Sequence, residues 1–162
     1  MAMNSLDQLF THFLKDMYTA EKTILETLPK MAKKADSSEL RKAFEEHEKQ
    51  TKNHVKRLEQ VFKLMDERVA GVPCKAIEGI VAEGKEIMNE AESADALDAG
   101  LIAAAQAVEH YEIARYGTMA AWAKELGMDE AAELLHETLE EEVETDEKLS
   151  ELAEERINQE AA

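Results

Sequence analysis

The chain contains few of the residues that cross-link, break or bend a fold. Its single cysteine, Cys74, excludes an internal disulfide. Only two prolines and six glycines occur among 162 residues, and a composition led by Ala, Glu, Leu and Lys favours helices over strands. The sequence also lacks a phosphate-binding glycine loop and a serine triad. It therefore predicts an all-α protein without a familiar nucleotide-binding or hydrolytic motif.

Long apolar runs are missing as well. No stretch approaches the roughly 20 apolar residues of a membrane span, and none resembles a secretory leader. We therefore expect a cytoplasmic protein with no membrane partner. With 44% hydrophobic residues, a chain of 162 residues has enough apolar side chains for one core, so we expect residues 1–162 to form a single domain.

Acidic residues outnumber basic ones by 36 to 19, and this excess of negative charge repels the phosphate backbone, so we expect no nucleic-acid partner. The excess is concentrated near the C-terminus, where residues 129–162 carry 14 acidic and 2 basic side chains. Residues 5–68 carry 12 acidic and 13 basic side chains. The acidic last helix is interpreted either as a solvated, solubilising face or as a surface that attracts cations.

Apolar residues recur at spacings of three and four, which predicts helices at about 5–34, 38–68, 75–91, 94–126 and 129–158. A direct hairpin between the second and fourth of these would need only a few residues. The roughly 25 residues available can instead carry the chain along the whole bundle, so the helices at 38–68 and 94–126 should run parallel. The predicted fold is a ferritin-like four-helix bundle with a long, helix-containing crossover between bundle helices 2 and 3.

Polar residues interrupt the apolar face of all four bundle helices at about the same level. Burying an unpaired carboxylate costs several kcal/mol, so such a cluster needs a cation. Carboxylates with imidazole suit iron or manganese, whereas structural zinc more often uses cysteine. We expect one or two ions, with Glu141 and Glu142 as alternatives on the last helix. The candidate ligands are Glu21, His47, Gln50, His54, Glu109, Glu112, Glu141 and Glu142.

Each of these residues also has an interpretation without a metal. Glu21 can extend to solvent, and His47 and His54 can donate hydrogen bonds to inward carboxylates. Glu141 and Glu142 belong to an acidic run that a helix can expose to water. The alternative function is therefore a dimeric bundle that acts through protein interaction and binds no metal.

Two stretches of sequence identify a family. SLDQLFTHFLKDMYTAEK at residues 5–22 and VEHYEIARYGT at residues 108–118 resemble the YciE/YciF family of bacterial ferritin-like proteins, and the resemblance extends over essentially the whole chain. It implies a stress-associated homodimer with a metal site and no firmly assigned reaction. Glu109-x-x-Glu112 is similar to the paired glutamates on the third helix of rubrerythrins, which are better-understood relatives.

The chain departs from the di-iron pattern of those relatives, which places Glu-x-x-His on the second and fourth bundle helices. This sequence has Thr51-x-x-His54 and Glu142-x-x-Thr145 instead, so each helix keeps half of the motif. The number of ions, and reactivity towards oxygen or peroxide in a stress response, therefore stay open at the level of sequence. Whether the protein is an enzyme stays open for the same reason.

Overall fold

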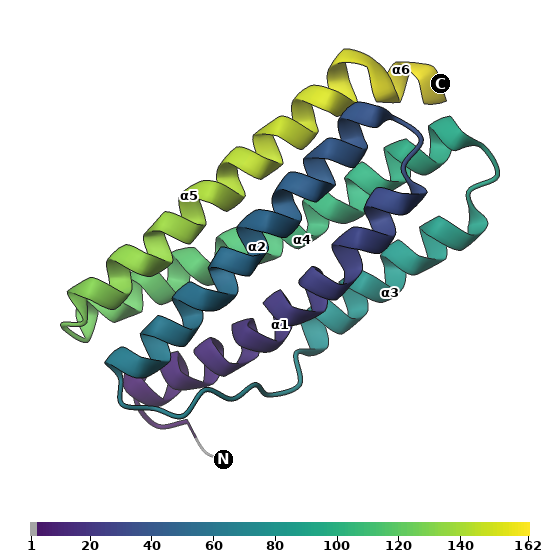
Figure 1. The fold of residues 1–162 in the computed structure, drawn as a ribbon. Coiled ribbons are helices and arrows are strands. Elements are labelled where there is room, and N and C mark those ends of the chain that lie inside the picture. The colour runs from purple at the N-terminus through teal and green to yellow at the C-terminus, as the bar shows by residue number, and fades with distance from the viewer. Residues whose placement is uncertain (1–2) are drawn as a thin grey trace.

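The computed structural model describes residues 3–162, and every regular element in this range is helical (Figure 1). The predicted all-α class is thus confirmed. None of the helices described combines the length and apolar character of a membrane span. The elements are α1 (Leu6–Lys34), α2 (Ser38–Leu64), α3 (Lys75–Glu90), α4 (Ala94–Glu125), α5 (Asp129–Leu152), a π-helical segment η1 (Ala153–Ile157) and α6 (Asn158–Ala161).

Helices α1, α2, α4 and α5 form the four-helix bundle, in which α2 and α4 run in the same direction (Figure 1). The start of α4 is tied to the turn between α1 and α2 by Asp98, a buried residue. Its carboxylate accepts hydrogen bonds from the backbone nitrogens of Asp36, at 2.9 Å, and Ser37, at 2.7 Å. Both helices therefore begin at the same end of the bundle, and the predicted parallel, ferritin-like arrangement is confirmed.

The crossover returns the chain along α1 before α3 begins. The backbone nitrogen of Val72 donates to the carbonyl oxygen of Lys15 at 3.3 Å. Gly71 lies so close to α1 that a Cβ atom there would be 2.2 Å from Thr19 Oγ1. Helix α3 then packs against α4 and α1, beside the bundle (Figure 1). The interior is therefore enclosed by the four long helices alone (Figure 1).

Two helix ends differ from the sequence prediction. Helix α2 ends at Leu64 rather than near residue 68, because Asp66 adopts a left-handed backbone conformation with a φ of 54°. The backbone nitrogen of Glu67 then donates back to the carbonyl of Phe62 at 3.0 Å, which closes the helix end. At the C-terminus, the regular helix ends at Leu152, and η1 and α6 continue the coil.

The interior of the bundle is apolar towards both ends and polar at its centre. Helix α2 shows this in one stripe, where buried Phe44 and Leu58 flank buried His47 and His54. On α1, Glu21 lies between Met17 and Ile24, which are also buried. The apolar layers exclude water from a polar layer to which all four long helices contribute.

Candidate metal centre

Six ionisable residues of the polar layer are at most 2% exposed to solvent. Helical spacing explains why they meet: residues three, four or seven apart lie on one face of a helix. The three-residue spacing of Glu109 and Glu112, and the seven-residue spacing of His47 and His54, therefore direct each pair inward. The six residues are Glu21 from α1, His47 and His54 from α2, Glu109 and Glu112 from α4, and Glu142 from α5.

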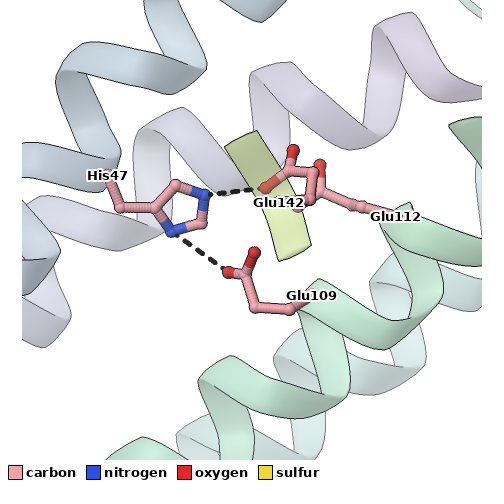
Figure 2. Close-up of side chains that lie close together, drawn as sticks. All are labelled: His47, Glu109, Glu112 and Glu142. Carbon is pink, nitrogen blue, oxygen red and sulfur yellow. Dashed lines mark ion pairs between the residues drawn. The ribbon is translucent and has the colours of Figure 1, made fainter. Parts of the chain in front are cut away.

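The first cluster, here the His47 group, comprises His47, Glu109, Glu112 and Glu142 (Figure 2). One ligand atom from each residue lies within 4.8 Å of one from every other. The imidazole lies between two carboxylates, with Nδ1 3.2 Å from Glu109 Oε1 and Nε2 3.4 Å from Glu142 Oε2. The group therefore offers three carboxylates and one imidazole to a common point.

The second cluster, here the His54 group, comprises Glu21, His54 and Glu142. Nδ1 of His54 lies 3.0 Å from Glu142 Oε1 and 3.4 Å from Glu21 Oε1. The buried hydroxyl of Tyr116 donates a hydrogen bond to Glu21 Oε1, which leaves Glu21 Oε2 without a partner. Because Glu142 belongs to both groups, the two clusters are adjacent and share a carboxylate.

Unsatisfied polar atoms are concentrated in this layer. In residues 3–162, every buried side-chain nitrogen or oxygen without a hydrogen-bond partner belongs to one of the six residues. Leaving such an atom unpaired costs about 1–3 kcal/mol, and more when the group is charged. Their concentration at one place is unusual for a protein interior, where buried polar atoms are normally hydrogen-bonded. The atoms are Glu21 Oε2, His47 Nε2, His54 Nδ1 and both carboxylate oxygens of Glu109, Glu112 and Glu142.

Burial and mutual repulsion change the acidity of the carboxyls on α4. Burial raises the pKa of Glu109 well above its ordinary value, and the nearby Glu142 raises it further. The pKa of Glu112 is raised in the same way, first by burial and then by Glu142 and Glu21. Without a cation, both carboxyls therefore hold protons more tightly than an exposed glutamate does.

His54 and Glu142 shift in the opposite sense and stabilise each other as ions. Burial alone would lower the pKa of His54, but Glu21, Glu141 and Glu142 outweigh it and raise the pKa to about 12. Burial would raise the pKa of Glu142, but the rings of His47 and His54 hold it below its ordinary value. His54 thus holds its proton tightly, and its positive charge offsets part of the negative charge of the surrounding carboxylates.

The structure gives two of the eight sequence candidates other partners. Gln50 is half-buried, and its side-chain oxygen accepts a hydrogen bond from the Thr145 hydroxyl at 3.3 Å. Glu141 contacts the far side of His54, with Oε2 2.7 Å from Nε2, and pairs with Arg57. Neither residue belongs to the His47 group or the His54 group. Of the two alternatives on the last helix, Glu142 points into the polar layer.

Arg57 lies near the site and is not among the sequence candidates. Its guanidinium pairs with Glu137 and Glu141 on α5. A signal was present, because Arg57 follows His54 by three residues and the two glutamates are four apart, so each pair shares a helix face. The pairing depends on the register between α2 and α5, which the sequence alone does not define.

The chain is similar in sequence and in structure to known bacterial proteins. Residues 5–162 match the family model described as a domain of unknown function, DUF892. YciF of Escherichia coli strain K12 is 42% identical over 162 residues, which is 99% of this chain and 98% of that protein. The crystal structure of this E. coli protein, described as a stress protein, superposes with a TM-score of 0.92 over 96% of this chain and 99% of that one.

Two further solved structures share the fold. YcfI from Rhodopseudomonas palustris is 42% identical, with a TM-score of 0.89 over 91% of this chain and 94% of that one. A protein of Xanthomonas campestris pv. campestris, at 22% identity and a TM-score of 0.77, covers 96% of this chain and 95% of its own, and supports the fold alone. On the family match and the full-length similarity to YciF, the chain belongs to the DUF892 family.

Proposed function

We propose that the protein binds two divalent ions of iron or manganese inside the bundle, one in the His47 group and one in the His54 group, with Glu142 shared. The observation that carries the proposal is the set of buried side-chain nitrogen and oxygen atoms without hydrogen-bond partners, all of which, within residues 3–162, lie in these two groups. A cation at each group would give these atoms a partner and offset the cost of burying them.

Charge balance supports two ions rather than one. The groups together contain four carboxylates, from Glu21, Glu109, Glu112 and Glu142. Two divalent cations would neutralise four ionised carboxylates with both histidines neutral, which is the form in which imidazole binds a metal. Carboxylate oxygens with imidazole nitrogen are ligands suited to iron and manganese, and neither group contains a thiolate.

The alternative is a metal-free bundle that acts through protein interaction, in which the polar residues satisfy one another. Two histidines can neutralise two of the four carboxylates, and the raised pKa values of Glu109 and Glu112 favour protonation of the other two, so charge balance alone does not separate the two functions. Both oxygens of Glu112 also lack a hydrogen-bond partner while that residue is fully buried. These two carboxylate oxygens of Glu112, which no other group of the described chain hydrogen-bonds, favour the metal-binding function.

The test is elemental analysis of protein purified without chelators, after exchange into metal-free buffer. We expect iron or manganese at a stoichiometry approaching two ions per chain. The matched control is a Glu109→Gln/Glu112→Gln double variant purified in parallel, which should retain far less metal. Equal and near-zero metal in both samples, even after incubation with excess iron(II) or manganese(II), would favour the metal-free alternative.

We infer further that the bound ions react with peroxide or oxygen in a stress response. Iron and manganese supply one-electron chemistry when bound, and the E. coli relative is described as a stress protein. When anaerobic protein loaded with iron(II) is mixed with hydrogen peroxide, two iron(II) ions should be oxidised to iron(III) for each peroxide reduced to water, as followed by absorbance. Iron that remains ferrous while peroxide is not consumed would restrict the function to metal binding.

A further inference from the structure

Glu141 lies outside both metal groups, but it contacts the ring nitrogen of His54 that faces away from them. Nε2 of His54 is 2.7 Å from Glu141 Oε2, while Nδ1 faces Glu142 and Glu21. A histidine that binds a metal through one nitrogen keeps its proton on the other. A hydrogen-bond acceptor at that second nitrogen therefore decides which nitrogen is free to bind.

Glu141 is itself held in place by a two-point contact with Arg57. Nη1 of Arg57 donates to Oε2 at 2.9 Å, and Nη2 donates to Oε1 at 2.8 Å. A paired contact of this kind fixes the plane of the carboxylate as well as its position. The Arg57 side chain is only 13% exposed, and Nη1 also lies 3.3 Å from the Thr138 hydroxyl. Rotation of Glu141 away from His54 would break several of these contacts together.

The other histidine has no such support. Both ring nitrogens of His47 face carboxylates of its own group, Glu109 and Glu142. Either nitrogen of His47 is therefore placed to meet an ion. His54 differs because one of its nitrogens is already engaged by a residue outside the metal groups.

We propose that Glu141, held by Arg57, is a positioning residue that keeps the proton of His54 on Nε2 and so presents Nδ1 to the ion of the His54 group. This rests on the proposed metal binding and assigns Glu141 a role other than that of a ligand. Loss of Glu141 should lower the affinity for the ion of the His54 group and leave the affinity for the ion of the His47 group nearly unchanged, since the two groups share only Glu142.

The first measurement is calorimetric titration of metal-free protein with manganese(II). Wild type should bind two ions, and Glu141→Ala should lower the affinity for one of them about 10- to 100-fold. This is the range typical for losing a hydrogen-bond partner of a ligating histidine. Glu141→Gln should lose less, because its amide oxygen can still accept from Nε2. Since both variants remove the same charge, a difference between them reports the hydrogen bond.

Glu140→Ala is the matched control, because Glu140 is the neighbouring residue, 68% exposed, and pairs only with His136 among the ion pairs of residues 3–162. It should bind both ions like wild type. Glu141→Ala is first checked for a cooperative melt. If it does not fold, Glu141→Leu, which has no acceptor but a side chain closer in size, is compared with Glu140→Leu instead. Equal metal affinities in wild type and in a folded Glu141→Ala or Glu141→Leu variant would overturn the proposal.

The second measurement reads the ring directly, by nitrogen-15 NMR of histidine-labelled protein loaded with diamagnetic zinc(II). His54 should show a protonated, slowly exchanging Nε2 and a metal-bound Nδ1, and Glu141→Ala should lose the slow exchange. A metal-bound Nε2 in wild type would overturn the role of Glu141 while leaving metal binding intact. Wild type that binds no ion at all would overturn both.

Discussion

Glu142 lies between the two histidines of α2, with Oε1 3.0 Å from His54 Nδ1 and Oε2 3.4 Å from His47 Nε2. His47 and His54 are seven residues apart, so their side chains project from the same face of α2 two turns apart. One carboxylate from α5 reaches both rings. It is the only residue shared by the two groups identified in residues 3–162, which makes it the structural link between the two proposed ions.

Replacing this shared carboxylate should affect both ions at once. Glu142→Gln should lower the affinity for each manganese(II) ion at least 10-fold in calorimetric titration, because each loses a charged ligand. The metal-free variant should also unfold more easily in urea, by about 3 kcal/mol, because buried His54 loses a carboxylate partner. The exposed neighbour Glu144 provides the control variant Glu144→Gln. An ion that still binds with wild-type affinity would show that Glu142 is not shared.

Metal binding should release protons. Imidazole binds a metal only after losing a proton, and the pKa of His54 is raised to about 12 in the metal-free protein. Glu109 and Glu112, whose pKa values are also raised, must ionise to ligate. The affinity for manganese(II) should therefore increase with pH. Titrations in buffers with different ionisation enthalpies measure the number of protons released, and a value of zero at neutral pH would contradict the proposed ligands.

The same pKa shifts predict how the stability of the metal-free protein depends on pH. The pKa values of Glu109 and Glu112 are raised in the folded chain, and that of His54 is raised to about 12. The folded chain therefore binds these protons more tightly than the unfolded chain does, and unfolding releases protons. The free energy of unfolding should then fall as pH rises, and the share from His54 should decline between about pH 6.5 and 12. Urea denaturation at pH 6.5, 7.5 and 8.5 measures this slope. A steady rise of stability across these pH values would contradict the assigned protonation.

Asp98 should stabilise the fold without affecting the metal. Its carboxylate accepts hydrogen bonds from the backbone nitrogens of Asp36 and Ser37 at the start of α2. Asp98 lies about three helical turns before Glu109 on α4, outside the polar layer. Asp98→Ala should cost about 2 kcal/mol in urea denaturation of the metal-free protein, because charged acceptors at a helix N-terminus are lost. Glu92→Ala, at an exposed position, is the control. Equal stability of the two variants would contradict this role, as would a changed manganese(II) affinity in Asp98→Ala.

The homodimer stays a prediction from the family resemblance. Val143 on α5 is one of the large hydrophobic side chains exposed on the surface, at 37%, and together with Leu139 it lines a shallow depression there. A second copy covering such a surface would remove apolar area from water. Sedimentation velocity at micromolar concentration should show two chains per particle. A single chain under these conditions would contradict the prediction.

The fold followed from the sequence because its signals were local and redundant. Repeated spacings of three and four residues defined the long helices, and the length of the segment around α3 indicated a crossover. The end of α2 was placed too late, at 68 rather than Leu64, because it depends on the left-handed conformation of Asp66. Because a non-glycine residue rarely adopts that conformation, the sequence pattern does not predict it.

The site was harder to predict where either of two adjacent residues could point into the bundle. Glu141 and Glu142 are neighbours about 100° apart around a helix, and both fit the acidic run. The structure separates them through Arg57, whose position opposite Glu141 depends on helix packing. Gln50 lies between His47 and His54 in sequence, but the inward position there is taken by Thr51, which is fully buried.

The most direct test of the metal centre is thermal melting of wild type and of Glu109→Gln/Glu112→Gln, each with and without excess manganese(II). Both carboxyls are fully buried with raised pKa values, so neutral amides of the same shape should leave metal-free stability level or higher. At 100 times its dissociation constant, each ion should stabilise wild type by about 2.7 kcal/mol, or roughly 5–10 °C in Tm, with little gain in the variant. A variant that is less stable without metal, together with a wild-type Tm that manganese(II) does not raise, would contradict the metal-binding account.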